Sequence, residues 1–222
     1  ELVAETAARF ELYVREGSTE SHKNYNWFGR PTHTEPCAYI DGFMAGYQLW
    51  QATGETSYLE EAHKIYFNGL GHGQRANGGF GCDDCSGSKD PHLRLKNAEA
   101  WWCCSMRGSE GLAKAAEYSF VRSENTLMLP FFNDATVSFN GGVFKISTAY
   151  PYEGAVTVKI EKTPQAGTEL AFFKPSWAGQ TAVALNGKAV ASTEKDNFIT
   201  VNSTLNTGDT LVYTFKQEPY LA

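Results

Sequence analysis

The stretch that organises this chain is Trp101-Trp102-Cys103-Cys104-Ser105-Met106-Arg107-Gly108, where a loop is expected to turn into a helix. Adjacent side chains point in different directions, so these two thiols cannot easily form a disulfide with each other. Three further cysteines lie upstream, and one shared soft metal ion accounts for such a set of thiolates. The leading interpretation is a zinc–thiolate site, either structural or catalytic.

Composition narrows the class of protein. The chain has 222 residues, of which 42% are hydrophobic and 20% charged, and no apolar run is long enough to cross a bilayer. The net charge of −6 comes without any basic cluster. We therefore expect neither nucleic acid nor a membrane as partner, which leaves neutral small molecules or glycans. The first residue is Glu1, so a signal peptide would not be visible, and a secreted, periplasmic or cytoplasmic location stays open.

The cysteines cannot all pair as disulfides, because there are five: Cys37, Cys82, Cys85, Cys103 and Cys104. Their C-x-x-C and C-C spacings suit a metal better than a disulfide framework. Disulfides with one spare thiol, and unrelated buried thiols, are the alternatives.

Two ligand sets fit this interpretation. In the first, Cys82 and Cys85 join the adjacent pair in an all-cysteine structural site. In the second, Glu35 and Cys37 at the start of a helix join the same pair. Spacing alone slightly favours the first set.

Residues 1–118 carry helical patterns. Apolar spacing predicts one helix over 1–16, and residues 17–33 have no clear periodicity and are predicted to form a loop. Thr34 is expected to cap a helix over about 35–53. A second helix over about 56–69 should form an antiparallel hairpin with it.

A glycine-rich loop is expected over 71–90, where it presents Cys82 and Cys85. A third long helix should begin near Cys103, and no strand is predicted before Phe120.

After residue 119 the pattern changes to short alternating runs rich in β-branched and aromatic residues, which predict an all-β sandwich. Asn186-Gly187 is the strongest hairpin signal, and Asn140-Gly141-Gly142 is another. The predicted fold class is therefore α+β with two domains, residues 1–118 and residues 119–222. The eight runs are TLMLPFF, TVSFN, GVFKISTAY, AVTVKIEK, ELAFFK, TAVALN, FITVN and TLVYTFKQ.

Six segments occur in the order found in one enzyme group, and together they resemble the β-L-arabinofuranosidase-like glycoside hydrolases, families 127 and 146. The resemblance runs from about residue 17 to the C-terminus. The segments are Thr34-Glu35-Pro36-Cys37, Tyr66-Phe67-Asn68-Gly69-Leu70, Cys103-Cys104 followed by Arg107, Thr148-Ala149-Tyr150-Pro151-Tyr152, Pro175-Ser176-Trp177-Ala178 and Leu185-Asn186-Gly187.

This resemblance implies the last hairpins of an (α/α)6 toroid followed by an antiparallel β-sandwich, with the rest of the toroid supplied by missing N-terminal sequence or by another chain. It reverses the preference between the ligand sets, because Glu35, Cys37, Cys103 and Cys104 match the family's zinc ligands. Cys103 matches the nucleophile of the family.

Glu20 lies close to where the family keeps its acid/base glutamate, although the sequence around it, Ser18-Thr19-Glu20-Ser21-His22, departs from the family pattern. Glu16 is a replacement candidate for the acid/base role.

The implied reaction is a retaining hydrolysis of an arabinofuranoside or a related plant or microbial glycan, in which a thiolate attacks and a carboxyl group protonates the leaving oxygen. Four loop residues are candidates for substrate contact: His22, His33 and His72 through sugar hydroxyls, and Trp27 through its ring.

Two other functions compete with a glycosidase. The chain can be a zinc-stabilised carbohydrate-binding or structural fragment without catalysis of its own, or a zinc hydrolase of another class. Arg107 is as suited to pairing with a carboxylate on a packed helix as to contacting substrate. Cys82 and Cys85 fall outside the family's ligand set, so a disulfide, a loop clip or a second metal site is open for them.

Overall fold

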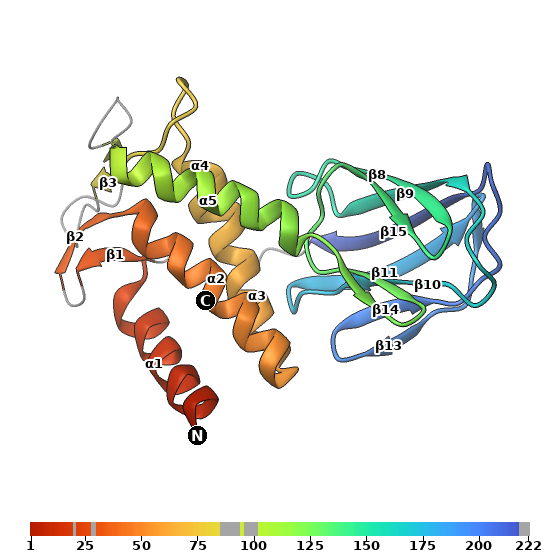
Figure 1. Cartoon of the computed structure of the whole chain (residues 1–222), viewed down its shortest axis with the longest axis horizontal. Helices are drawn as coiled ribbons and strands as arrows, with labels where there is room; N and C mark the ends of the chain where they lie inside the picture. The colour runs from red at the N-terminus through yellow and green to blue at the C-terminus, as the bar shows by residue number, and fades with distance from the viewer. Residues whose placement is uncertain (20, 28–29, 85–93, 96–101, 218–222) are drawn as a thin grey trace. The chain divides into compact units, whose positions relative to one another are not determined.

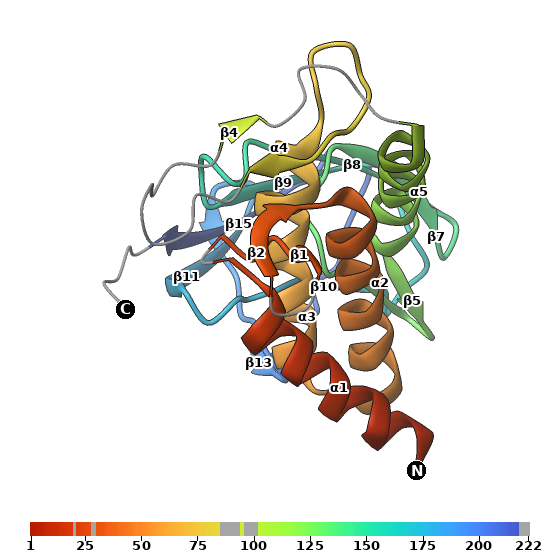
Figure 2. The same cartoon turned by 90° about the vertical axis from the view of Figure 1, so that its left-hand side faces the viewer.

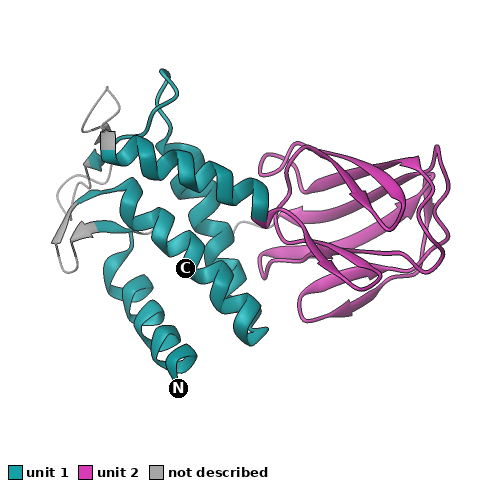
Figure 3. Ribbon diagram, viewed as in Figure 1, with its two compact units in different colours: residues 1–117 teal, residues 118–222 magenta. Residues whose placement is uncertain are grey.

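The computed structural model describes the chain apart from residues 20, 28–29, 85–93, 96–101 and 218–222 (Figure 1). Two compact units divide it, residues 1–117 and residues 118–222 (Figure 3). Long helices occur in the first unit, and the second consists of strands. No helix among the described residues combines the length and hydropathy required to cross a bilayer.

Helices α1 (Leu2–Gly17), α2 (Pro36–Thr53), α3 (Thr56–Lys64) and α5 (Trp102–Tyr118) form the bulk of the first unit (Figure 2). The predicted hairpin of α2 and α3 is present, and it turns at Gly54, whose φ of 77° is left-handed and whose N–H bonds to the carbonyl of Trp50. Close helix packing depends on Gly46, because an added Cβ there would lie 2.9 Å from the carbonyl oxygen of Tyr58.

The predicted helix over 56–69 is not a single α-helix. After α3 the chain widens into a π-helical turn, η1 (Ile65–Leu70), and then forms the short α4 (Gly71–Gly73) inside the predicted glycine-rich loop. Apolar spacing over six residues cannot separate an i→i+4 from an i→i+5 ladder, so the sequence did not reveal this change.

The first unit also contains strands, so the prediction of none before Phe120 is wrong. The strands β1 (Tyr25–Trp27), β2 (Arg30–Thr34), β3 (Asp83–Asp84) and β4 (Arg94–Leu95) pair antiparallel in that order. Strands of two to five residues are too short to show a two-residue period, and this is why residues 17–33 and 71–90 read as loop only.

Thr34 does not cap α2. It ends β2, where it pairs with Asp83, and its hydroxyl makes no capping bond because Glu35 occupies the N-cap position. The strand therefore leads directly into the helix, and this junction places Glu35.

The second unit holds a five-stranded sheet, β13-β14-β10-β6-β5, and a six-stranded sheet, β12-β11-β15-β9-β8-β7 (Figure 1). The predicted runs each contain a strand. Neighbours pair antiparallel except β6 and β10, which pair parallel, so the sandwich is not wholly antiparallel. The strands are β5 (Val121–Ser123), β6 (Thr126–Leu129), β7 (Ala135–Phe139), β8 (Gly142–Thr148), β9 (Ala155–Lys162), β10 (Glu169–Phe173), β11 (Ala178–Leu185), β12 (Lys188–Ala189), β13 (Thr193–Lys195), β14 (Phe198–Val201) and β15 (Thr210–Gln217).

The core of the sandwich follows the two-residue period. Alternate residues of β15, including Leu211 and Tyr213, are fully buried, and the ring of Tyr213 stacks on that of Phe172 with centroids 5.0 Å apart. The Asn186-Gly187 hairpin is confirmed, since both residues have positive φ angles and Leu185 pairs with Lys188 across the turn.

Candidate metal centre

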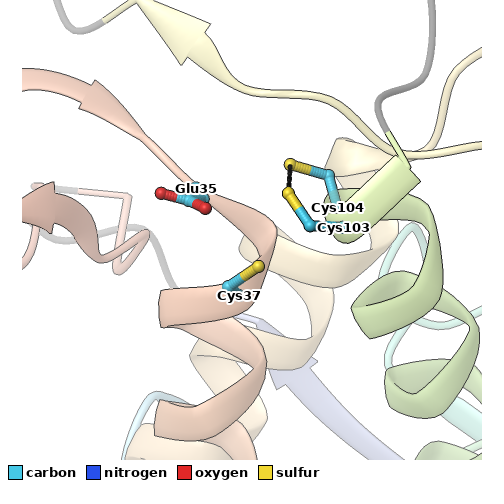
Figure 4. Close-up of side chains that lie close together, drawn as sticks. All are labelled: Glu35, Cys37, Cys103 and Cys104. Carbon is cyan, nitrogen blue, oxygen red and sulfur yellow. Dashed lines mark hydrogen bonds between the residues drawn. The ribbon is translucent and has the colours of Figure 1, made fainter.

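Four side chains from two helix starts converge in the first unit: Glu35, Cys37, Cys103 and Cys104 (Figure 4). Their ligand atoms all lie within 4.8 Å of one another. Cys104 is fully buried, whereas the other three are half-buried. One carboxylate and three thiols at this separation form a donor set that can surround a single ion.

The start of α2 is fixed from both sides. The backbone N–H of Glu35 donates to the carbonyl oxygen of Asn24 over 3.3 Å, and the Glu35 carbonyl accepts bonds from Ala38 and Tyr39. Pro36 stands at the first helical position, where its missing N–H costs nothing. Cys37 therefore falls in the first turn of the helix.

The adjacent pair lies in the first turn of α5, as the sequence predicted. Free N–H groups at a helix N-terminus favour negative charge, so both helices favour the ionised form of the thiols that they carry. Two helix N-termini that meet at one donor set suit a site of several anionic ligands.

Without a cation the donors oppose one another's ionisation. Burial, followed by the neighbouring Glu35 and Cys103, raises the pKa of the Cys37 thiol to about 12. Burial, followed by the neighbouring sulfurs of Cys82 and Cys103, also raises the pKa of Cys104. A divalent ion between the donors would reverse this balance, because it attracts each ionised ligand. The donor set thus fits a thiophilic cation such as zinc.

The structure brings together the second of the two ligand sets. Cys82 contacts the group only at one side, with its Sγ 3.9 Å from that of Cys104, and Cys85 lies outside the described residues. The adjacent pair itself has an Sγ–Sγ distance of 3.9 Å.

Comparison with known proteins agrees with the sequence resemblance. Residues 126–216 match the family model of the β-L-arabinofuranosidase GH127 middle domain. No curated protein matches the chain significantly. The resemblance to the GH127 family is confirmed.

Solved structures share the fold of this chain at low sequence identity. One, a glycoside hydrolase, is 23% identical with a TM-score of 0.68, and the match covers 83% of this chain and 33% of that one. A GH127 β-L-arabinofuranosidase from Geobacillus stearothermophilus T6 is 16% identical with a TM-score of 0.68, covering 93% and 37%. A GH127 β-arabinofuranosidase is 18% identical with a TM-score of 0.70, covering 92% and 37%. The chain therefore spans about a third of the length of these structures.

The catalytic carboxylate suggested by the GH127 resemblance, Glu20, lies outside the described residues, but the segments on either side of it are described. Ser18 and Asn24 pair in a β-bridge, and the Asn24 amide donates to the Ser18 hydroxyl over 2.8 Å. Asn24 is also the residue that accepts the Glu35 N–H. Asn24 thus bonds both to Ser18 and to the N-cap residue of α2.

The structure gives the predicted substrate contacts different surroundings. His22 has a left-handed backbone, and its Nδ1 lies 2.7 Å from a carboxylate oxygen of Glu61 on α3. His33 is half-buried in β2, where it pairs with Asp84. Trp27 ends β1, and its side chain is outside the described part of the structure.

His72 lies on α4, exposed, with Lys23 beside it. The Lys23 ammonium group has only donors, so the Nδ1 atom of His72 accepts the bond between them, which is 2.9 Å long. The Lys23 charge, followed by burial, lowers the pKa of His72. Its other ring nitrogen then carries the proton, which makes His72 a neutral hydrogen-bond donor.

A buried ion cluster escaped the sequence analysis. Asp83 accepts bonds from Lys23 over 2.6 Å and from Arg75 over 2.9 Å, and all three side chains are at most 4% exposed. Arg75 also donates to the carbonyl oxygen of Cys82. No local signal distinguishes these charges from solvated ones, because charged residues are usually exposed.

The sequence left open whether Arg107 pairs with a carboxylate or contacts substrate. In the structure it lies against the carboxylates of Asp41 and Glu110.

Proposed function

We propose that the first unit carries the zinc site and nucleophile of a retaining glycoside hydrolase that acts on arabinofuranosides or related plant or microbial glycans. The observation that carries this proposal is the convergence of one carboxylate and three thiols at two helix starts. The match of residues 126–216 to the GH127 middle domain supports it independently, because that evidence comes from the other unit.

Glu35, Cys37, Cys103 and Cys104 would hold the ion. Bound zinc would keep the thiols ionised at neutral pH, which supplies a sulfur nucleophile without a separate base. Exposure separates the two adjacent cysteines, since Cys104 is fully buried and Cys103 is half-buried. Cys103 is therefore the sulfur of this pair that a substrate can reach, and Cys104 serves as a ligand alone.

Cys103 attacks the anomeric carbon, and the bond between that carbon and the leaving oxygen breaks. A carboxylic acid on the other side of the scissile bond protonates the departing oxygen, and its carboxylate then activates water to hydrolyse the thioglycosyl intermediate. Two displacements retain the configuration at the anomeric carbon.

We assign the acid/base role to Glu20. A retaining reaction requires its two catalytic groups at about 5–5.5 Å from each other. The bond from the Glu35 N–H to the Asn24 carbonyl supports this assignment, because it joins a residue close to Glu20 in the sequence to one of the proposed ligands. His72 is assigned to a sugar hydroxyl as a neutral donor, and His22, His33 and Trp27 remain further candidates for substrate contact.

The four long helices would form the last part of an (α/α)6 toroid, completed by protein outside this sequence. Three apolar residues on α1 support this proposal, since Leu2, Val3 and Leu12 are 77%, 44% and 42% exposed. A groove of about 370 Å³ between α1 and α3 is lined in part by Phe10 and Val14. Packing of further helices would remove such surface from water.

Metal analysis tests the site on this chain alone. We expect one zinc ion per chain after purification without chelator under reducing conditions. Replacing Cys37 or Cys104 with Ser should abolish retention of the ion, whereas Cys85→Ala should not change it. A protein without metal, or loss of the ion in Cys85→Ala, would contradict the ligand set.

Covalent labelling tests the nucleophile. A thiol-alkylating arabinofuranose analogue should modify Cys103 alone, and arabinose should protect that residue. This result would separate a glycosidase from a carbohydrate-binding or structural fragment, in which no cysteine has a reason to react selectively. A zinc hydrolase of another class would instead keep its activity when Cys103 is replaced with Asp.

Kinetics test Glu20 in protein with a complete toroid. Glu20→Gln should reduce turnover of natural glycans much more than the first step with nitrophenyl glycosides, whose leaving group needs no protonation. Equal losses on both substrates would remove Glu20 from the role and favour Glu16 or a carboxylate from outside this sequence.

A further inference from the structure

Among the four described cysteines, Cys82 has no part in the proposed ligand set. It is 5% exposed, and its Sγ lies 3.9 Å from that of Cys104, a proposed ligand. We propose that Cys82 and Cys104 form an oxidisable dithiol whose disulfide competes with the metal for Cys104. This inference rests on the ligand set proposed above, but its chemistry requires no glycosidase activity.

Cys82 is positioned by its neighbours rather than by a flexible loop end. Arg75 donates to its carbonyl oxygen over 2.8 Å, and the next residue, Asp83, pairs with Thr34 in the sheet. Asp83 is itself held by two buried cations. These contacts hold the Cys82 thiol close to Cys104, which favours a bond between the two sulfurs.

The other sulfur near Cys104 is a poorer partner. Cys103 is equally close at 3.9 Å, but the two residues are adjacent in the first turn of α5. A disulfide between neighbours would require the helical backbone to distort, because their side chains diverge. Cys82 comes from a different segment and is free of this restriction, although its sulfur must still move to reach the bonding distance of about 2.05 Å.

Hydrogen peroxide is the oxidant class that suits a buried pair, because it is little larger than water. One thiol attacks peroxide to give a sulfenic acid and a water molecule, and the second thiol then attacks that sulfur and releases a second water. Two thiols thereby lose two electrons and two protons, and peroxide is reduced to two waters. The product leaves three of the four proposed donors for the ion.

The two states of the site exclude each other. A Cys104 sulfur engaged by a metal is not available to Cys82, and a disulfide sulfur is a poor ligand compared with a thiolate. Zinc should therefore slow oxidation, and oxidation should prevent zinc uptake. Because a thiol reductant reverses a disulfide but not a sulfinic acid, Cys82 would also protect Cys104 from permanent loss.

Peptide mapping of the metal-free 222-residue chain after peroxide treatment tests the bond directly. Trypsin places Cys82 in residues 76–89, Cys37 in residues 24–64, and Cys103 with Cys104 in residues 97–107. We expect a cross-link between peptides 76–89 and 97–107, with fragment ions that assign it to Cys82 and Cys104. Zinc added first should suppress this product.

Variants supply a second readout. Oxidised wild-type chain should take up zinc at least about tenfold more weakly and recover after dithiothreitol. Oxidised Cys82→Ala should lose zinc uptake and should not recover it after dithiothreitol. The matched control Cys85→Ala should behave as wild type. Circular dichroism of both variants reports whether they fold.

Three outcomes would overturn the proposal: a bond between Cys82 and Cys85, a bond that involves Cys37 or Cys103, or full recovery of oxidised Cys82→Ala. These results are separate from those on glycosidase activity. A chain that forms the cross-link but never binds zinc would contradict the ligand set and leave the dithiol in place. A chain that binds zinc but forms no cross-link would contradict the dithiol and leave the ligand set in place.

Discussion

Replacement of Asp83 by Asn should greatly destabilise the helical unit. The Asp83 carboxylate accepts bonds from Lys23 and Arg75, whose side chains are 1% and 4% exposed. Asn is nearly the same size but neutral, so the variant removes the carboxylate that the two buried cations share. Breaking a buried ion pair by removing one partner costs about 3–5 kcal/mol.

Urea unfolding measures this loss, with ellipticity at 222 nm as the signal because the described helices all lie between residues 2 and 118. Metal-free, reduced protein removes the contribution of a bound ion. With a slope of about 2 kcal/mol per molar urea, the expected cost corresponds to a midpoint about 1.5–2.5 M lower.

Two matched variants define the comparison. Lys23→Met keeps the bond between Arg75 and Asp83, so it should cost less, about 1–3 kcal/mol for one charged hydrogen bond. Lys114→Met removes the half-exposed pair with Glu117 on α5, which should contribute at most about 0.5 kcal/mol. If Asp83→Asn unfolds as late as Lys114→Met, the buried cluster does not stabilise the unit and the reasoning is wrong.

Three further substitutions have defined expectations. Gly108→Ala would place a Cβ on the ring of Phe80. The overlap cost of about 3 kcal/mol should exceed the gain of about 1 kcal/mol in helix propensity, so calorimetry should show a lower Tm. An unchanged Tm would contradict this packing. Tyr39→Phe removes a buried hydroxyl that has no hydrogen-bond partner among the described residues, so the free energy of unfolding in urea should rise by about 1 kcal/mol, and a clear decrease would reveal a partner. Gly187→Val forces a β-branched residue to a φ of 77° and should cost the sandwich about 1–2 kcal/mol in thermal unfolding, a loss that Lys188→Val in the neighbouring strand should not reproduce.

The sandwich and the long helices could be predicted from local sequence. The runs of alternating residues after 119 each contain a strand, and Asn186-Gly187 makes the hairpin that its backbone preferences demand. The start of α5 next to the paired cysteines was also visible, because helical spacing and caps are local signals. The short strands β1 to β4 and the π-helical turn were not, since each is too brief to impose a period on the sequence.

The candidate site divides in the same way. Residue types and the adjacent Cys103 and Cys104 were enough to suggest a metal, but spacing alone slightly favoured Cys82 and Cys85 as their companions. Only the tertiary structure places Glu35 and Cys37 against the pair, because that contact joins two helix starts more than sixty residues apart in the chain.

Burial was decided by the tertiary structure alone. Lys23, Arg75 and Asp83 look like ordinary surface charges in the sequence, yet all three are buried. Periodicity reports which face of one element is apolar, whereas the environment of a charged side chain depends on segments that the chain brings together from elsewhere. The local sequence therefore determined which helices and strands form, and the packing between distant segments determined which charges and thiols meet.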